Sequence, residues 1–107
     1  MECAPDLPAL KHAANEAVAL LKTLGNPDRL LLLCQMAAQE CSVSELEELL
    51  DIHQPTLSQQ LGILRRAGLV STRKEGKQIF YRLSSDKATE VIATLYGLYC
   101  QPPGPTP

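Results

Sequence analysis

Residues 42–83 read SVSELEELLDIHQPTLSQQLGILRRAGLVSTRKEGKQIFYRL, and this stretch decides the fold. Ser42 followed by Glu45 has the form of a capping box, in which each side chain hydrogen-bonds the other residue's amide, so a helix begins here. Its apolar face is formed at helical spacing by Val43, Leu46, Leu49 and Leu50. The pattern breaks at Asp51, and Pro55 suits the first position of a second helix.

The second helix has a buried stripe at Leu57, Leu61 and Leu64, and Gly68 ends it. Residues 69–73 and 78–83 then have strand patterns, and Lys74-Glu75-Gly76-Lys77, with its two lysines, joins them as a turn. A helix-turn-helix followed by a basic hairpin is a winged helix, whose second helix enters the major groove. The sequence therefore predicts a mainly α fold with a small β-hairpin that binds double-stranded operator DNA.

The front of this second helix carries neutral polar side chains outside its apolar stripe. Glutamine, serine and threonine can both donate and accept hydrogen bonds, as contacts with base edges require. An ordinary solvated face is the plainer interpretation. We predict base contacts from Gln54, Thr56, Ser58 and Gln59, and phosphate or minor-groove contacts from Arg65, Arg73, Lys74 and Lys77. Gln60 is also predicted as a DNA-binding residue.

Charge is segregated along the chain although the net charge is only −2. Seven of the ten lysines and arginines lie within residues 65–87, which hold two acids. Residues 40–51 hold five acids and no base. Because phosphate binding depends on local potential, this distribution is compatible with DNA binding, and the net charge predicts weak non-specific binding.

The flanking segments predict three more helices. Residues 8–23 have an amphipathic pattern, and a helix that starts at Pro27 should be buried on all sides because residues 30–34 are entirely apolar. The last helix, from residues 84–86 to Cys100, carries too many apolar residues for a small monomer. We therefore expect a homodimer through the first and last helices. Residues 1–7 should form a flexible arm, 8–100 the DNA-binding and dimerisation domain, and 101–107 a disordered proline-rich tail.

The sequence contains no membrane-length apolar run and no secretory leader, so we expect a cytoplasmic protein. In that reducing compartment its four cysteines are more typical of sensing, catalysis or metal binding than of structural disulfides.

Three motifs together resemble the ArsR/SmtB family of bacterial repressors: KTLGNPDRL at 22–30, QPTLSQQL at 54–61 and GKQIFYRL at 76–83. The resemblance covers roughly residues 10–100. It implies a homodimeric winged helix that leaves its operator when an inducer binds. The arsenic and cadmium sensors of the family have a Cys-x-Cys pair where this chain has Ser42-Val43-Ser44, and hydroxyls do not replace thiolates for soft metals. The last helix also lacks the histidine ligands of the zinc and cobalt sensors.

Cys34 and Cys100 resemble the thiol pair of the persulfide-responsive, BigR-like branch of the family. That resemblance implies that reactive sulfur joins the two thiols as a disulfide or polysulfide and lowers DNA affinity. We expect no metal and no other cofactor. Two alternative functions for a protein of this fold remain open: a metal- or metalloid-responsive repressor, and a general thiol redox sensor.

The plainer interpretation of Cys34 is a small buried hydrophobe. Cys3 is interpreted as incidental, no partner is identified for Cys41, and His12 and His53 are interpreted as ordinary polar residues. A thiol enzyme is disfavoured because the chain lacks Cys-x-x-Cys and a nucleophile–histidine–acid set. A winged helix that binds only protein is the remaining rival.

Overall fold

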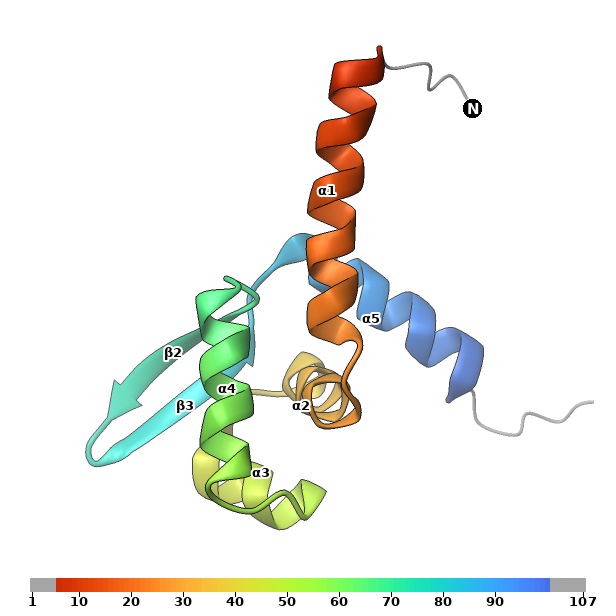
Figure 1. Ribbon diagram of the computed structural model, residues 1–107. Helices are drawn as coiled ribbons and strands as arrows, with labels where there is room; N and C mark the ends of the chain where they lie inside the picture. Colours follow the sequence, from red (N-terminus) through yellow and green to blue (C-terminus); the bar gives the residue numbers. More distant parts are fainter. Residues whose placement is uncertain (1–5, 101–107) are drawn as a thin grey trace, which may run out of the picture.

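The computed structural model describes residues 6–100, and in this range the chain forms five helices and a three-stranded antiparallel sheet (Figure 1). The winged-helix architecture predicted from the sequence is confirmed. In chain order the elements are α1 (Leu7–Leu24), α2 (Pro27–Ala38), β1 (Cys41–Ser42), α3 (Val43–Leu50), α4 (Thr56–Arg66), β2 (Val70–Glu75), β3 (Gln78–Leu83) and α5 (Asp86–Tyr99).

The capping box at the start of α3 is present in full. The Glu45 amide donates to Ser42 Oγ at 3.2 Å, and the Ser42 amide donates to Glu45 Oε1 at 2.8 Å. The helix ends at Asp51, whose φ of 56° is left-handed. Pro55 precedes α4 as its N-cap residue instead of occupying the first helical position, a shift of one residue from the prediction.

The end of α4 is a Schellman motif. The Gly68 amide donates to the Arg65 carbonyl at 3.0 Å, and the Leu69 amide donates to the Leu64 carbonyl at 3.1 Å. Gly68 has a φ of +76°, which a side chain would oppose. Leu69 thus belongs to the helix ending, so β2 begins at Val70 and extends to Glu75, beyond the predicted range of 69–73.

The sheet has one more strand than the two-stranded hairpin predicted from the sequence. The short strand β1 pairs with β3 through Cys41 with Tyr81 and Ser42 with Phe80, which makes β3 the central strand. Two residues are too short for a strand pattern to be recognised in the sequence. This pairing attaches the wing to the connection between α2 and α3.

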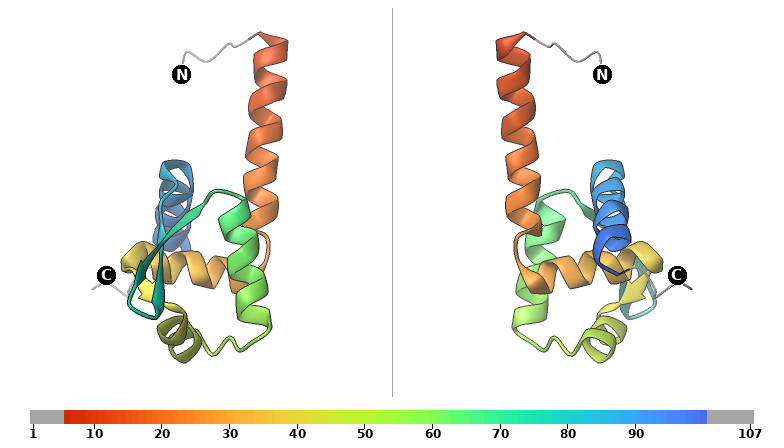
Figure 2. Two further views of the ribbon diagram at one scale, coloured as in Figure 1. Left: turned by 90° about the vertical axis from the view of Figure 1, so that its left-hand side faces the viewer. Right: turned by 90° about the vertical axis from the view of Figure 1, so that its right-hand side faces the viewer.

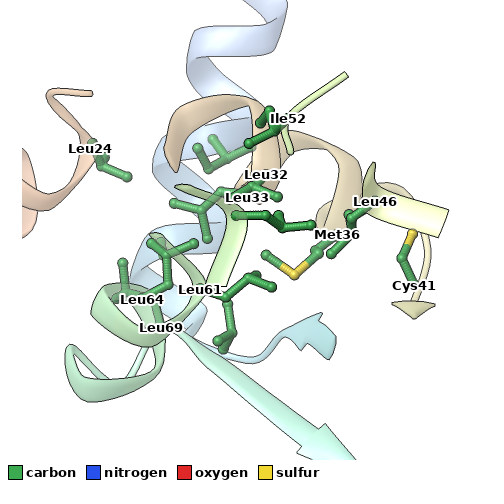
Figure 3. Packing of buried hydrophobic residues seen from close by; sticks show 14 residues of the cluster. Leu24, Leu32, Leu33, Met36, Cys41, Leu46, Ile52, Leu61, Leu64 and Leu69 are labelled. Carbon is green, nitrogen blue, oxygen red and sulfur yellow. The ribbon is translucent and has the colours of Figure 1, made fainter. Parts of the chain in front are cut away.

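The core is centred on α2 and is built mainly from leucines of α2, α3 and α4 (Figure 3). Its fully buried leucines are Leu32, Leu33, Leu46, Leu57, Leu61 and Leu64. The prediction that α2 is buried on all sides is wrong for the single chain, since Leu31 is 47% exposed. Leu49, predicted on the apolar face of α3, is 56% exposed because that short helix covers the core with only one side.

Helix α1 projects from the rest of the molecule, and all three ribbon views show its N-terminal part standing apart (Figures 1 and 2). The Cα radius of gyration is 16.2 Å, whereas a compact domain of 100 residues has about 13 Å. Among its residues only Leu24 is buried. Large apolar side chains are exposed on α1 and on the last turns of α5, at Leu7, Leu10, Val18, Leu21, Tyr96, Leu98 and Tyr99.

The predicted arm of residues 1–7 overlaps α1 by one residue, because α1 already begins at Leu7, where the Asp6 carboxylate accepts from the Ala9 amide at 3.2 Å. Residues 1–5 of the arm, with Cys3, and the predicted tail at 101–107 lie outside the described residues. Between residues 6 and 100, no helix is both long and apolar enough to cross a membrane.

Candidate nucleic-acid interface and thiol pair

The N-terminal half of α4 presents polar side chains on the side opposite the core. Leu57 and Leu61 are buried and fix the rotation of the helix, so that Ser58 and Gln59 are exposed. Thr56 is half-buried at the first helical position. Ser58 and Gln59 therefore have the access that contact with base edges in a major groove requires.

Gln54 has a structural task at the start of the same helix. Its Oε1 accepts a hydrogen bond from the Ser58 amide at 3.0 Å, which satisfies one of the free amides of the first turn. The side chain remains exposed. A base contact by Gln54 would use its amide nitrogen while its oxygen caps the helix.

Gln60 is half-buried and bonded within the protein, which differs from the outward position predicted for it. Its Oε1 accepts from Arg29 Nη1 at 2.9 Å. Arg29, near the start of α2, also donates from Nε to the Thr23 carbonyl at 2.6 Å and from Nη2 to the Lys22 carbonyl at 3.3 Å. Gln60 thus joins α4 to α2 and to the end of α1, and it does not share the exposed face of Ser58 and Gln59.

The tip of the wing is cationic and open to solvent. Lys74 and Lys77 are exposed on either side of the turn at Gly76, whose φ is +63°. Arg65 is exposed near the end of α4. These three cations have the access that phosphate contacts require.

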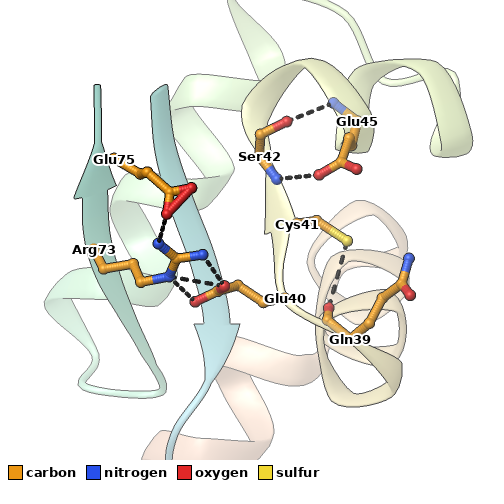
Figure 4. Close-up of polar contacts among 7 residues, drawn as sticks. All are labelled: Gln39, Glu40, Cys41, Ser42, Glu45, Arg73 and Glu75. Atoms are coloured by element: carbon orange, nitrogen blue, oxygen red, sulfur yellow. Dashed lines mark hydrogen bonds and ion pairs between the residues drawn. The ribbon is translucent and has the colours of Figure 1, made fainter. Parts of the chain in front are cut away.

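Arg73 is the exception among the predicted phosphate contacts (Figure 4). Its Nε lies 2.9 Å from both carboxylate oxygens of Glu40, its Nη2 2.7 Å from Glu40 Oε1, and its Nη1 3.0 Å from Glu75 Oε1. The guanidinium lies 4.6 Å from the centre of the Phe80 ring. These contacts raise the pKa of Arg73 and lower that of Glu40, so both groups are charged. Arg73 therefore differs from the other three predicted phosphate contacts, because its guanidinium is already paired within the protein.

The two thiols predicted to act together lie on helices that contact each other. Cys34 is half-buried on α2, and Cys100 is exposed at the C-cap of α5, which packs against α2. Burial raises the pKa of the Cys34 thiol, and the charge of a Cys100 thiolate raises it further. Both are free thiols.

Cys41 is fully buried at the start of β1, and its environment is that of a structural residue (Figure 4). Its Sγ donates to the Gln39 carbonyl at 3.4 Å, and the side-chain nitrogen Nε2 of Gln35 lies 4.0 Å from the sulfur. Burial raises the pKa of this thiol as well, which disfavours the reactive thiolate.

The residues at the start of α3 are engaged in helix capping, with Ser42 in the capping box described above. Within residues 6–100, no group of three or more His, Cys, Asp and Glu side chains is arranged to hold a metal ion. His53 lies between two carboxylates, 2.7 Å from Asp51 and 3.4 Å from Glu47. It thus has an ordinary polar environment.

Sequence reasoning missed two residues that organise this surface, Arg29 and Glu40. Arg29 belongs to the KTLGNPDRL motif, and a cation in the first turn of a helix, where the dipole disfavours positive charge, was the available signal. In the sequence Glu40 is only one of five acids in residues 40–51. No local pattern pairs it with Arg73.

Comparisons with known proteins agree with this architecture. The family model described as "Bacterial regulatory protein, arsR family" matches residues 26–72. A "Biofilm growth-associated repressor" from Agrobacterium fabrum is 59% identical over 96 residues, covering 90% of this chain and 82% of that protein. Its namesake from Xylella fastidiosa is 52% identical over 91 residues, covering 85% and 80%.

Solved structures give the same result. "Reduced HlyU from Vibrio cholerae N16961" superposes with a TM-score of 0.85 at 45% identity, covering 89% of this chain and 100% of that one. The "transcriptional repressor BigR from Xylella fastidiosa" has a TM-score of 0.80 at 50% identity, covering 87% and 92%.

Proposed function

The chain belongs to the ArsR family of bacterial regulatory proteins, and on this basis we propose that it is a homodimeric repressor with a thiol switch. In the reduced state it binds operator DNA. When reactive sulfur species join Cys34 to Cys100, it releases the operator. The observation that carries DNA binding is the exposed face of Ser58 and Gln59 on α4, together with the exposed lysines of the wing tip. Relatives named as repressors support the direction of regulation.

The exposed apolar residues of α1 and α5 support a dimer. A groove of about 630 Å³ separates α1 from the start of α5, and alanines and leucines form much of its lining. A second copy of α1 and α5 would cover these surfaces and remove their apolar area from water. A dimer that presents its two α4 helices about 34 Å apart meets successive major grooves of one duplex.

The chemistry of the switch starts at the more accessible thiol. The Cys100 thiolate attacks the sulfane sulfur of a persulfide, RSSH, forms Cys100-S-SH and releases RS⁻. The Cys34 thiolate then attacks Cys100 Sγ, which forms the disulfide and expels HS⁻. If Cys34 is also persulfidated before the two residues join, its outer sulfur attacks Sγ of the Cys100 persulfide, which forms a trisulfide and expels HS⁻.

The raised pKa of Cys34 supports this order of events. A thiol with a raised pKa has little thiolate at neutral pH, and the thiolate is the nucleophile. Cys34 is therefore a slow first nucleophile towards a small oxidant in solution. Once Cys100 holds an activated sulfur nearby, the reaction becomes intramolecular and a small thiolate fraction suffices.

A bridge between these cysteines would tie α2 to the C-terminal end of α5. Because α5 carries part of the proposed dimer surface, the bridge acts where the spacing of the two recognition helices is set. A direct disulfide needs Cα atoms within about 7 Å, and each inserted sulfur relaxes that limit. The switch is thus a two-state element biased by the redox state of one thiol pair.

The test measures intact mass and DNA binding on the same samples, before and after a low-molecular-weight persulfide is added. The probe is a duplex of about 30 base pairs, long enough to span two half-sites one turn apart. It is selected from a randomised pool by the reduced wild-type chain. We expect a Cys34–Cys100 crosslink, with or without an added sulfur atom, together with loss of DNA binding.

Serine variants test the contribution of each thiol to the release of DNA. Cys34→Ser and Cys100→Ser should keep the duplex after treatment, whereas Cys3→Ser, the matched control, should release it as the wild type does. Unchanged mass with DNA still bound would reject the thiol switch. An equal response to hydrogen peroxide would identify a general redox sensor, and release by zinc, cadmium or arsenite would identify a metal-responsive repressor.

Base reading has its own test at Gln59. Gln59→Ala should weaken binding to the selected duplex by about 1–3 kcal/mol, the usual value of a good base contact, and should leave binding to random duplex nearly unchanged. Ser71→Ala, on a half-buried wing residue, is the matched control. Equal losses on both duplexes for Gln59→Ala would show that its side chain reads no base.

A further inference from the structure

We propose that helix α2 is the frame on which both DNA-contacting elements are fixed: a Glu40–Arg73 latch holds the wing at its C-terminal end, and an Arg29–Gln60 bond holds α4 at its N-terminal end. Arg73 and Gln60 are then positioning residues that do not contact DNA. This inference rests on the proposed DNA binding and deepens it.

The latch spans the whole sheet (Figure 4). Arg73 lies on the edge strand β2 and reaches across the central strand β3, over Phe80, to Glu40 just before β1 on the far edge. All three guanidinium nitrogens lie within 3.0 Å of a carboxylate oxygen of Glu40 or Glu75. A DNA phosphate would have to displace two carboxylates to bind this side chain.

A side-chain contact of this kind matters for the wing because few backbone pairs attach the β2–β3 hairpin to the rest of the chain. Within residues 6–100, the strand pairing beyond the β2–β3 hairpin itself is limited to the two residue pairs of β1 with β3. An isolated two-stranded hairpin is marginally stable in water. The side chains of Arg73 and Lys74 point to opposite faces of the sheet, so fixing Arg73 also fixes the direction in which Lys74 points.

The other end of α2 is fastened in the same manner. Arg29 bonds Gln60 at 2.9 Å while its other nitrogens bond two carbonyls at the end of α1. The Arg29–Gln60 and Glu40–Arg73 contacts both join residues far apart in sequence, separated by 31 and 33 positions. Since Cys34 lies between these two ends on α2, a bridge that displaces α2 would move α4 and the wing together.

The first test compares Arg73→Gln, Glu40→Gln and the double variant, all reduced, on the selected duplex. A latch predicts that each single variant weakens binding about three- to tenfold and that the double variant is no weaker than either, as expected for two members of one bond network. The dependence of log K on log salt should stay unchanged, because no phosphate contact is lost.

A phosphate contact by Arg73 gives the opposite pattern. Arg73→Gln would then lower the salt slope by about 0.9, and Glu40→Gln would bind equally or more tightly because a competing carboxylate is gone. Lys77→Gln, at the exposed wing tip, is the positive control for such a slope change. Either that pattern or unchanged affinity in both single variants would overturn the latch.

Arg73→Lys separates charge from geometry. Lysine keeps the positive charge but lacks the planar fork that bonds Glu40 through two nitrogens, so the latch predicts a loss close to that of Arg73→Gln. Full recovery of affinity by lysine would count for a phosphate contact. Thermal unfolding of each variant confirms that the chain is folded at the assay temperature.

Gln60 is tested by its own pair of variants. Gln60→Glu keeps an acceptor for Arg29 and should retain duplex affinity, whereas Gln60→Leu should lose about three- to tenfold. If Gln60 contacted DNA directly, glutamate would be at least as harmful as leucine because phosphates repel it. A wild-type chain that selects no duplex would reject the DNA-binding proposal itself, an outcome distinct from the failure of the variants alone.

Discussion

The inner helices α2, α3 and α4 and the outer helices α1 and α5 are all rich in apolar side chains, but they use them differently. Six leucines of the inner group are fully buried around α2. In the outer group, Leu10, Leu21 and Tyr96 are more than half exposed. The inner helices are therefore stabilised by contacts within one chain, whereas the outer helices leave apolar surfaces exposed, which we propose are covered by a second chain. Substitutions in the two groups should have different consequences.

The largest effect on stability should come from the inner group. Leu57→Ala removes a fully buried side chain of α4 and should lower the free energy of unfolding by about 2–5 kcal/mol, because the cavity closes only in part. Leu10→Ala on α1, which is 51% exposed, is the matched control and should cost far less in the single chain. Urea unfolding at one fixed protein concentration measures both. Equal losses would show that the two groups share one core.

The next effect should appear in assembly. Leu21→Asp places a charge on the exposed apolar side of α1 and should convert the dimer to a folded monomer, which sedimentation detects. Because a monomer engages one half-site, affinity for the selected duplex should fall at least about tenfold.

Asn15→Asp adds the same charge on α1 away from the stripe formed by Leu10, Val18 and Leu21, and it should leave the dimer intact. A Leu21→Asp variant that sediments as a dimer would place the interface elsewhere.

The same contrast explains what the sequence could and could not predict. The capping box of Ser42 with Glu45 and the stripe of Leu57, Leu61 and Leu64 are local, because their members lie three or four residues apart and follow helix geometry. The winged-helix fold follows from such patterns. The Glu40–Arg73 contact joins residues 33 positions apart, and no local rule assigns a partner to a charged side chain over that distance. The sequence therefore predicts a phosphate or minor-groove contact for Arg73 and gives no sign of its pairing with Glu40.

Burial of apolar residues was predicted with the same limit. Helical spacing identifies the apolar side of a helix, but it does not say whether this chain or another one covers it. The sequence predicts burial for Leu31, Leu32, Leu33 and Leu49 alike. In the structure Leu32 and Leu33 are buried, whereas Leu31 and Leu49 are exposed. Only the packing of α2 and α3 against their neighbours distinguishes these four positions.

Removal of a helix N-cap should have a smaller effect on stability, and the effect should differ between the inner and the outer helices. Ser42→Ala removes the N-cap of α3, an inner helix, and should lower the free energy of unfolding by about 1 kcal/mol. Asp6→Ala removes the corresponding cap of α1, whose first turns are exposed, so it should fray that end with little change in global unfolding. Urea unfolding and amide exchange distinguish the two outcomes. A global loss with Asp6→Ala as large as with Ser42→Ala would show that the start of α1 belongs to the cooperative unit.

The smallest effect should be the pH dependence that His53 gives to the inner group. Hydrogen bonds to Asp51 and then to Glu47 raise the pKa of His53 above its ordinary value of 6.5, because both carboxylates favour the imidazolium. A raised folded-state pKa means that this stabilisation is fully present below about pH 6.5 and is lost as the pH rises through the raised value. The side chain is 66% exposed, so solvent screening keeps the effect below that of Ser42→Ala. The Tm of the wild type should therefore fall slightly relative to that of His53→Asn across this window, whereas His12→Asn on the outer helix α1 should follow the wild type. A difference between wild type and His53→Asn that does not change with pH would show that the His53 pairing does not stabilise the turn between α3 and α4.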